Sequence, residues 1–289
     1  MIAPGHVTGL GKPLLPEIAF GGYLLVMFLL LLPVAGIGSR DTQVFFLLSL
    51  FAALVYWQTR LRATPWVLRL RLLYYPLAMN VAFQQLRSAV PLLHPTRQDD
   101  LLQGIDRFLL GETPSLLLQG WTPPLVADLF SFFYLLFFPY LLFSFIYYLF
   151  EDADRAVRFY SGLFVLYAAG FLGYLVIPAA GPWLALADHF TLPVQGGWLT
   201  RVNDAMVSQG SNGVDVFPSL HCAVSAYLLF FDRRCKPWRY RLYLLPCVGL
   251  WLSTLLLRYH YLVDVLAGFL LAFLCLRLAF STMASIERG

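Results

Sequence analysis

Charged residues are scarce in this sequence. Only 12% of its 289 residues are Asp, Glu, Lys or Arg, whereas 60% are hydrophobic and the mean hydropathy is +0.71. Because soluble globular proteins carry about 25% charged residues, this composition excludes that class and indicates a polytopic membrane protein. The net charge of +4 reflects loop arginines beside a membrane surface, and nothing in the sequence indicates nucleic acid as a partner.

Cysteine is also scarce. The four cysteines, Cys222, Cys235, Cys247 and Cys275, lie in or next to apolar segments and lack C-x-x-C spacing. This pattern is typical of reduced packing residues and indicates neither a disulfide framework nor a metal site. No carboxylate cluster suits Mg²⁺ either. We therefore expect a protein without metal or other cofactor.

Apolar runs of roughly the length that spans about 30 Å of hydrocarbon recur along the chain. We expect about eight transmembrane helices, near 18–38, 43–58, 72–93, 125–150, 157–177, 219–232, 241–257 and 260–280. The first run lacks a basic leader and a small-residue cleavage site, so we expect a retained span. The fold class is an all-α polytopic membrane helical bundle.

Internal repeats and low-complexity linkers are absent too. Residues 1–289 are therefore treated as a single integral membrane domain. Within it, we expect accessory N-terminal spans over 1–65 and a catalytic core of about six helices over 66–281.

Two short motifs place ionisable groups in this apolar chain. They are Phe217-Pro-Ser-Leu-His221 and Arg258-Tyr-His-Tyr-Leu-Val-Asp264. Ionisable groups inside a membrane segment are costly, which makes them functional candidates. His260 and Asp264 are four residues apart and would share one helix face. The carboxylate could then accept from one ring nitrogen and leave the other free for chemistry.

The first motif predicts a helix start. Pro218 and Ser219 are typical of the first residues of a helix, with Ser219 as the N-cap and His221 in the first turn. Free backbone N–H groups and the positive end of the helix dipole make such a start a natural phosphate seat. Together the two motifs indicate phosphoryl transfer through histidine.

The paired motifs resemble those of the type 2 phosphatidic acid phosphatase superfamily over about residues 100–280. The sequences F-P-S-L-H and H-Y-x-V-D are more similar to its inositol phosphorylceramide synthase branch than to the usual phosphatase form. Leu220 stands where that form has glycine, Thr254 stands where it has arginine, and the motif K-x6-R-P is absent. The resemblance implies His260 as the nucleophile that forms a phosphohistidine, Asp264 as its orienter and His221 as the acid that protonates the leaving group.

Arginines are the expected phosphate ligands, since a guanidinium fork suits phosphoryl oxygens. Arg87 continues a polar stripe with Asn80 and Gln84 on one face of the third span, and Arg258 adjoins His260. We name Arg258, Arg87 and Ser219 as substrate-binding candidates. An interhelical hydrogen-bond anchor is an equal alternative for Arg87, and a snorkelling span end is the alternative for Arg258.

Two long loops flank these motifs. Residues 95–124 predict a short helix along the membrane interface, and Asp106-Arg-Phe-Leu-Leu-Gly111-Glu-Thr-Pro114 resembles a segment that precedes the core in bacterial members of the branch. Residues 178–218 lead directly into the first motif, and we expect them to cover part of the active site. Tyr259 and Tyr261 are interpreted as interfacial aromatics.

These observations favour a membrane enzyme that cleaves a lipid phosphate ester or phosphodiester. Its acceptor is water if it is a phosphatase, and a polar hydroxyl if it is a phosphotransferase. A transport or non-catalytic protein remains an alternative, because polar stripes can line a pathway. An electron carrier is a third alternative, because two intramembrane histidines could ligate haem.

Lysine and arginine counts predict the orientation of the chain. With the N-terminus inside, the inside segments carry 13 cations, namely Lys12, Arg60, Arg62, Arg69, Arg71, Arg155, Arg158, Arg233, Arg234, Lys236, Arg239, Arg241 and Arg288. The outside segments carry 5, namely Arg40, Arg97, Arg107, Arg201 and Arg258. Both histidine motifs then face the non-cytoplasmic side, which is periplasm, cell exterior or lumen.

Impermeant thiol labelling in intact cells tests this orientation. In a cysteine-free background, a single cysteine at Gln209 should be labelled and one at Trp238 should not, because Trp238 lies in a basic loop that stays inside. Labelling at Trp238 and protection at Gln209 would invert the topology.

Overall fold

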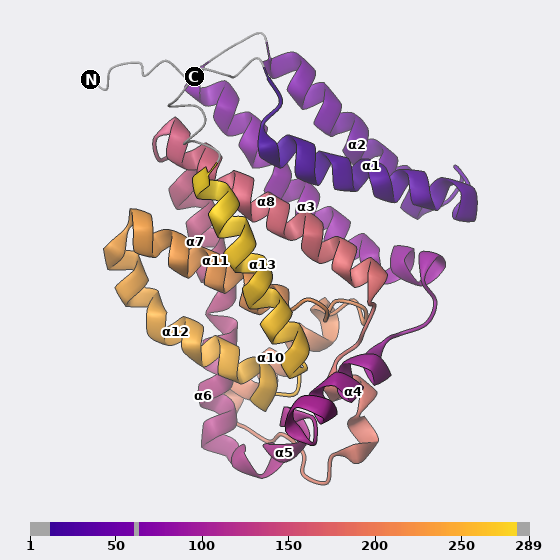
Figure 1. Cartoon of the computed structure of the whole chain (residues 1–289), viewed down its shortest axis with the longest axis vertical. Coiled ribbons are helices and arrows are strands. Elements are labelled where there is room, and N and C mark those ends of the chain that lie inside the picture. The colour runs from indigo at the N-terminus through magenta and orange to yellow at the C-terminus, as the bar shows by residue number, and fades with distance from the viewer. Residues whose placement is uncertain (1–11, 61–63, 282–289) are drawn as a thin grey trace. The chain divides into compact units, whose positions relative to one another are not determined.

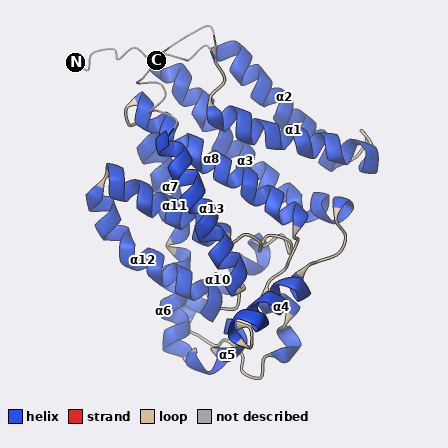
Figure 2. Cartoon of the chain, viewed as in Figure 1, coloured by secondary structure: helices blue, strands red, loops and turns tan. Residues whose placement is uncertain are grey.

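The computed structural model describes residues 12–60 and 64–281, and this part of the chain is helical (Figure 2). Its α-helices are α1 (Leu15–Ala35), α2 (Arg40–Thr59), α3 (Pro65–Leu93), α4 (Asp99–Leu110), α5 (Pro114–Leu117), α6 (Pro124–Leu135), α7 (Phe137–Leu149), α8 (Ala153–Val176), α9 (Pro182–Ala185), α10 (Trp198–Gly210), α11 (Leu220–Cys235), α12 (Pro237–Leu256) and α13 (Leu262–Ser281). Two 3-10 helices, η1 (Gln119–Trp121) and η2 (Ala187–His189), complete the list. The predicted all-α fold class is confirmed.

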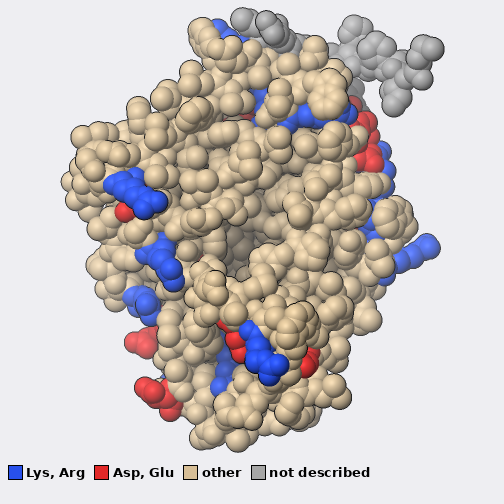
Figure 3. Space-filling view, turned by 180° about the vertical axis from the view of Figure 1, so that it is seen from behind, with Lys and Arg blue, Asp and Glu red and all other residues tan. Residues whose placement is uncertain are grey.

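Five segments are long and apolar enough to cross a membrane within the described residues. They are α1, α2, the α6–α7 pair over 124–149, α8 and α13. Most of the surface drawn in Figure 3 is correspondingly neither acidic nor basic. The protein is an integral membrane protein, as predicted. The other three expected spans correspond to α3, which contains Arg69, Arg71 and Arg87, to α11, which has 16 residues, and to α12.

The chain divides into two compact units. Unit 1 comprises residues 1–93, 144–168 and 277–289, and unit 2 comprises residues 94–143 and 169–276. Helices α7, α8 and α13 therefore contain residues of both units. The organisation predicted from the sequence, with accessory spans up to residue 65, remains a prediction.

Unit 1 contains the packed helices α1, α2 and α3. Arg71 on α3 binds both carboxylate oxygens of Glu17 on α1, with Nε–Oε1 at 2.7 Å and Nη2–Oε2 at 2.6 Å, and both side chains are buried. The expectation that Arg69 and Arg71 lie in a loop is wrong, because α3 begins at Pro65. The pairing with Glu17 explains why a buried arginine is tolerated in this helix. Arg62 and Arg288, which were counted as inside cations, lie outside the described residues.

Unit 2 contains both histidine motifs. Its helix α12 packs against α11 and α6, and α6 packs against α10 (Figure 1). The long segment 178–218 is more regular than a loop, because it forms α9, η2 and the 13-residue helix α10. Residues 95–124 form the predicted short helix as α4, which is followed by α5 and η1.

A buried ion pair holds the turn between α11 and α12. The Nε of Arg239 lies 2.9 Å from Oδ1 of Asp232, and both side chains are 0% exposed. The Tyr140 hydroxyl donates to the other carboxylate oxygen, Oδ2, at 2.8 Å. Arg239 therefore belongs to α12 and to the interior, although it was counted among loop cations.

We expect Asp232→Asn to destabilise the protein by about 3–5 kcal/mol, because it leaves the Arg239 guanidinium buried without its counter-charge. Thermal unfolding in detergent measures this change. The exposed Arg241 supplies the control, since Arg241→Gln should change the free energy of unfolding by less than about 0.5 kcal/mol. Equal unfolding midpoints for the two variants would contradict the prediction.

Candidate active site

His221 lies in the first turn of α11, as the sequence predicts. Ser219 is the N-cap, because its Oγ accepts a hydrogen bond from the Cys222 N–H at 3.4 Å. The start of this helix packs closely on α8, where a Cβ added at Gly170 would lie 2.5 Å from Cδ2 of Leu220. The leucine that replaces the glycine of the phosphatase motif therefore fills the space beside Gly170.

His260 lies in a tight turn between α12 and α13. The Thr254 carbonyl accepts hydrogen bonds from the backbone N–H groups of Tyr259 and His260, at 2.9 and 3.0 Å. Arg258 adopts a φ of 70°, a left-handed conformation that costs a residue other than glycine about 1–3 kcal/mol. Because α13 begins at Leu262, the prediction that His260 lies on the same helix as Asp264 is wrong.

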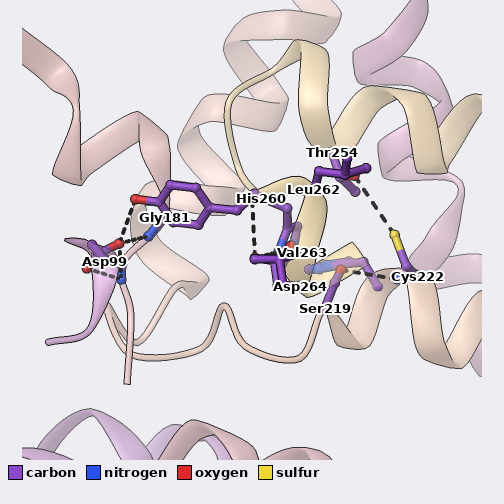
Figure 4. Close-up of polar contacts among 12 residues, drawn as sticks. Asp99, Gly181, Ser219, Cys222, Thr254, His260, Leu262, Val263 and Asp264 are labelled. Atoms are coloured by element: carbon purple, nitrogen blue, oxygen red, sulfur yellow. Dashed lines mark hydrogen bonds and ion pairs between the residues drawn. The ribbon is translucent and has the colours of Figure 1, made fainter. Parts of the chain in front are cut away.

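The turn nevertheless brings His260 onto Asp264 (Figure 4). Nδ1 of His260 lies 3.1 Å from Oδ2 of Asp264, and the two side chains are 4% and 0% exposed. The Tyr261 N–H donates to the same oxygen at 3.2 Å. The ionised form of Asp264 can only accept, and in that state Nδ1 is the donor and Nε2 keeps its lone pair.

The second motif is tied to the first through backbone atoms. The Ser219 N–H donates to the Asp264 carbonyl at 3.0 Å. Gly268 permits this approach, since a Cβ there would lie 2.5 Å from the Ser219 carbonyl oxygen. The rings of His221 and His260 consequently lie 5.8 Å apart between centroids.

An aromatic wall surrounds His221. The rings of Tyr134 and Phe137 each lie 4.8 Å from the His221 ring, and the Tyr134 hydroxyl lies 3.1 Å from its Nε2. Nothing in the sequence distinguishes Tyr134 from the other 15 tyrosines. Only the packing of α6 against the start of α11 identifies it as a site residue.

The three substrate-binding candidates have different surroundings. Arg258 is 7% exposed, its guanidinium lies 3.8 Å above the Phe190 ring, and it donates to the Leu192 carbonyl. Burial lowers the pKa of Arg258, a cost that an anionic ligand would offset. Ser219 is fully buried and engaged as the N-cap. Arg87 is an exposed residue of α3 in unit 1, so it does not belong to the unit that carries the histidines.

Polar residues of the segment 203–215 adjoin the same turn. The Tyr259 hydroxyl accepts from Nδ2 of Asn203 at 2.9 Å and lies 3.4 Å from Oδ1 of Asp204. Burial raises the pKa of Asp215, and this carboxylate is close enough to His260 to interact with it electrostatically. Tyr259 and Tyr261 are 7% and 0% exposed, so their interpretation as interfacial aromatics is wrong.

Two carboxylates of α4 reach the turn from the other side. Asp106 accepts hydrogen bonds from the N–H groups of Leu262 and Val263, at 2.9 and 3.0 Å. Burial raises the pKa of Asp106, and these two hydrogen bonds oppose that effect. Asp99 accepts from the Gly181 N–H and from the Tyr261 hydroxyl, each at 3.0 Å. Their seven-residue spacing, which puts both on one helix face, was the available sequence signal.

The arrangement suits nucleophilic and acid–base chemistry. One buried imidazole has a carboxylate on Nδ1 and a lone pair on Nε2, and a second imidazole faces it. Such a pair can form a bond to an electrophile at one ring and deliver a proton from the other. Among the described residues, no group of three His, Cys, Asp or Glu side chains is placed to hold a metal ion.

Comparisons with known proteins agree with this chemistry. Residues 101–278 match a family model described as PAP2 superfamily. The phosphoinositol dihydroceramide synthase of Bacteroides thetaiotaomicron is 28% identical over 159 residues, which are 50% of this chain and 52% of that protein. The inositol phosphorylceramide synthase catalytic subunit AUR1 of Saccharomyces cerevisiae is 29% identical over 111 residues, which are 34% of this chain and 28% of that protein.

The match to these relatives is partial. The chain spans about half the length of the first relative and less of the second. Both relatives are named as synthases that join phosphoinositol to a ceramide. This is the branch that the F-P-S-L-H motif resembles, so the predicted branch is confirmed. No solved structure matches the chain significantly.

We expect Tyr134→Phe to lower kcat by about 2–10-fold, because it removes one hydrogen bond to His221 and leaves the ring in place. Tyr240→Phe, in the first turn of α12, is the matched control and should leave kcat unchanged. Steady-state kinetics on a lipid phosphate substrate measure both. A Tyr134→Phe enzyme as active as the control would exclude a role for this hydroxyl.

Proposed function

The chain belongs to the PAP2 superfamily, and we propose that it is a membrane-embedded lipid phosphotransferase that works through a phosphohistidine. The observation that carries the proposal is the buried His260–Asp264 pair, with Nδ1 on the carboxylate and the His221 ring 5.8 Å away. This geometry provides an oriented nucleophile and an acid in one place. A lipid phosphate or phosphodiester is the substrate, and the bilayer supplies it.

The first step forms a bond between Nε2 of His260 and phosphorus. The bond from phosphorus to the leaving oxygen breaks, and protonated His221 gives its proton to that oxygen. Asp264 stabilises the positive charge that develops on the His260 ring. In the second step, neutral His221 takes the proton of an acceptor hydroxyl, whose oxygen attacks phosphorus and releases His260.

The acceptor decides between transferase and phosphatase. If it is water, a phosphate ester gives free phosphate and a phosphodiester gives the phosphorylated head group; if it is a polar or lipid hydroxyl, the same group is transferred to that hydroxyl. The named activities of the relatives support transfer of an inositol phosphate head group to a ceramide-type hydroxyl. The aromatic wall of Tyr134 and Phe137 around His221 is consistent with limited access of water.

Arg258 is the proposed phosphate ligand closest in sequence to the nucleophile. Its burial and its place beside His260 support this role. Arg87 and Ser219 are retained as weaker proposals, since Arg87 belongs to unit 1 and Ser219 already serves as the N-cap. No metal is required in this scheme, because arginine can neutralise the phosphoryl charge.

The active site is proposed to face the non-cytoplasmic side. The excess of cations in the segments assigned to the inside supports this orientation. Gln209 and Trp238, the two positions chosen for thiol labelling, are both exposed and therefore accessible to the reagent.

We expect His260→Ala and His221→Ala each to lower kcat by more than about 1,000-fold, and Asp264→Asn by about 100-fold or more, with the protein still folded in detergent. The assay is incubation with a panel of phospholipids and hydroxyl acceptors, with products identified by mass spectrometry. EDTA should leave turnover unchanged.

A trapped phosphorylated peptide identifies the nucleophile. Wild-type enzyme quenched in base should carry a phosphoryl group on His260, with the head group still attached if the donor is a phosphodiester, and His260→Ala should carry none. Wild-type turnover by His260→Ala would exclude the covalent mechanism. A Soret band in the visible spectrum of the purified protein would instead support an electron carrier.

A further inference from the structure

Helix α4 buries carboxylates and exposes large apolar side chains, which is the reverse of the usual arrangement in a soluble protein. Its buried side chains include two carboxylates, Asp99 and Asp106, whereas Phe108 is 88% exposed and Leu109 is 50% exposed. Burial of a carboxylate is costly unless hydrogen-bond donors surround it. The donors that surround these two carboxylates all belong to segments at the candidate active site.

Asp106 acts on the first turn of α13. The first N–H groups of a helix have no partner within the helix itself. Each oxygen of Asp106 accepts from one of them, Oδ2 from Leu262 and Oδ1 from Val263. Its negative charge also lies at the positive end of the helix dipole. A residue 156 positions earlier in the chain thus caps the helix that begins two residues after His260.

Asp99 binds two other segments, the one that begins α9 and the turn that contains His260. It accepts from the N–H groups of Ala180 and Gly181, and from the Tyr261 hydroxyl. The Gly181 position is restricted as well, because its φ is 87° and an added Cβ would collide with the Tyr259 carbonyl. Asp99 therefore binds Tyr261, the residue after His260, and also binds the N–H of Gly181, which lies close to the carbonyl of Tyr259, the residue before His260.

Tyr261 connects these contacts to the histidine. Its hydroxyl binds Asp99, while its N–H donates to the same Asp264 oxygen that receives Nδ1 of His260. A shift of Tyr261 would therefore disturb the hydrogen bonds at the Asp264 oxygen that His260 also binds.

We propose that Asp106 and Asp99 are positioning residues, which act from α4 to hold His260 and Asp264 in the reactive geometry. This inference rests on the proposed function for its kinetic consequence, but its structural part does not. The proposal gives a role to the segment Asp106-Arg-Phe-Leu-Leu-Gly111. The resemblance of this segment to bacterial members of the branch did not by itself indicate one. Neither carboxylate touches the reacting atoms.

Substitution by asparagine distinguishes the contribution of Asp106 from that of Asp99. In Asp106→Asn, one of the two acceptor oxygens becomes an NH₂ group that faces a backbone N–H, so one hydrogen bond is lost and two donors meet. In Asp99→Asn the remaining oxygen can still serve Gly181 and Tyr261, so the effect should be smaller. Asp100→Asn is the matched control, because Asp100 is adjacent in sequence and exposed.

We expect Asp106→Asn to lower kcat by about 10–100-fold with KM changed less than about twofold, since misplacement of a reacting group by 1 Å can cost about 100-fold. Asp99→Asn and Tyr261→Phe should show smaller losses of kcat, and Asp100→Asn none. A purely structural role would lower the amount of folded enzyme and leave kcat per folded molecule unchanged.

Hydrogen exchange without substrate provides a test that does not depend on catalysis. The amides of Tyr261, Leu262 and Val263 should exchange faster in Asp106→Asn than in wild type, whereas those of α11 should not. Should Asp106→Asn fail to fold, Tyr261→Phe takes its place, because it removes only the link to Asp99. Unchanged exchange and unchanged kcat in the folded variants would overturn the proposal, even if His260→Ala were inactive. If the amides exchange faster in Asp106→Asn but the wild-type enzyme turns over no lipid phosphate, the positioning contacts are supported and the proposed function is rejected.

Discussion

A carboxylate that is withdrawn from water must be stabilised by hydrogen bonds, and Asp264 meets this constraint with few donors. It is 0% exposed, and its Oδ2 receives one hydrogen bond from the His260 ring and one from the Tyr261 N–H. Within the described part of the chain, its Oδ1 has no hydrogen-bond partner. The two donors to Oδ2 stabilise this carboxylate, so the turn that presents them has to keep its conformation.

The segments around this turn are built to hold it. The Thr254 carbonyl accepts the N–H of His260, and the Ser219 N–H donates to the carbonyl of Asp264 itself. Asp106 supplies the acceptors that the first turn of α13 lacks. The left-handed conformation of Arg258 persists because these contacts over-determine the backbone around it. The same interactions that stabilise the buried charge thus also fix the nucleophile proposed for the reaction.

Local patterns predicted the elements and local contacts well. Ser219 as the N-cap, His221 in the first turn and the His260–Asp264 contact follow from short-range chemistry, and all three occur in the structure. The helix boundary at His260 was predicted wrongly, because the five-residue turn between α12 and α13, which is held by hydrogen bonds to the Thr254 carbonyl, is invisible to a periodicity argument. Helix α10 was missed because its sequence is polar and glycines precede it, as in a loop.

The sequence by itself determined that the chain is an integral membrane protein with two histidine motifs, because composition and residue spacing are properties of short stretches. Only the tertiary structure brought Tyr134 to His221 across 87 residues, Asp106 to Leu262 across 156 and Asp99 to Tyr261 across 162. These partners are single polar residues among many of their kind. What distinguishes them is burial beside a donor or acceptor from a distant helix, and no local pattern encodes that proximity.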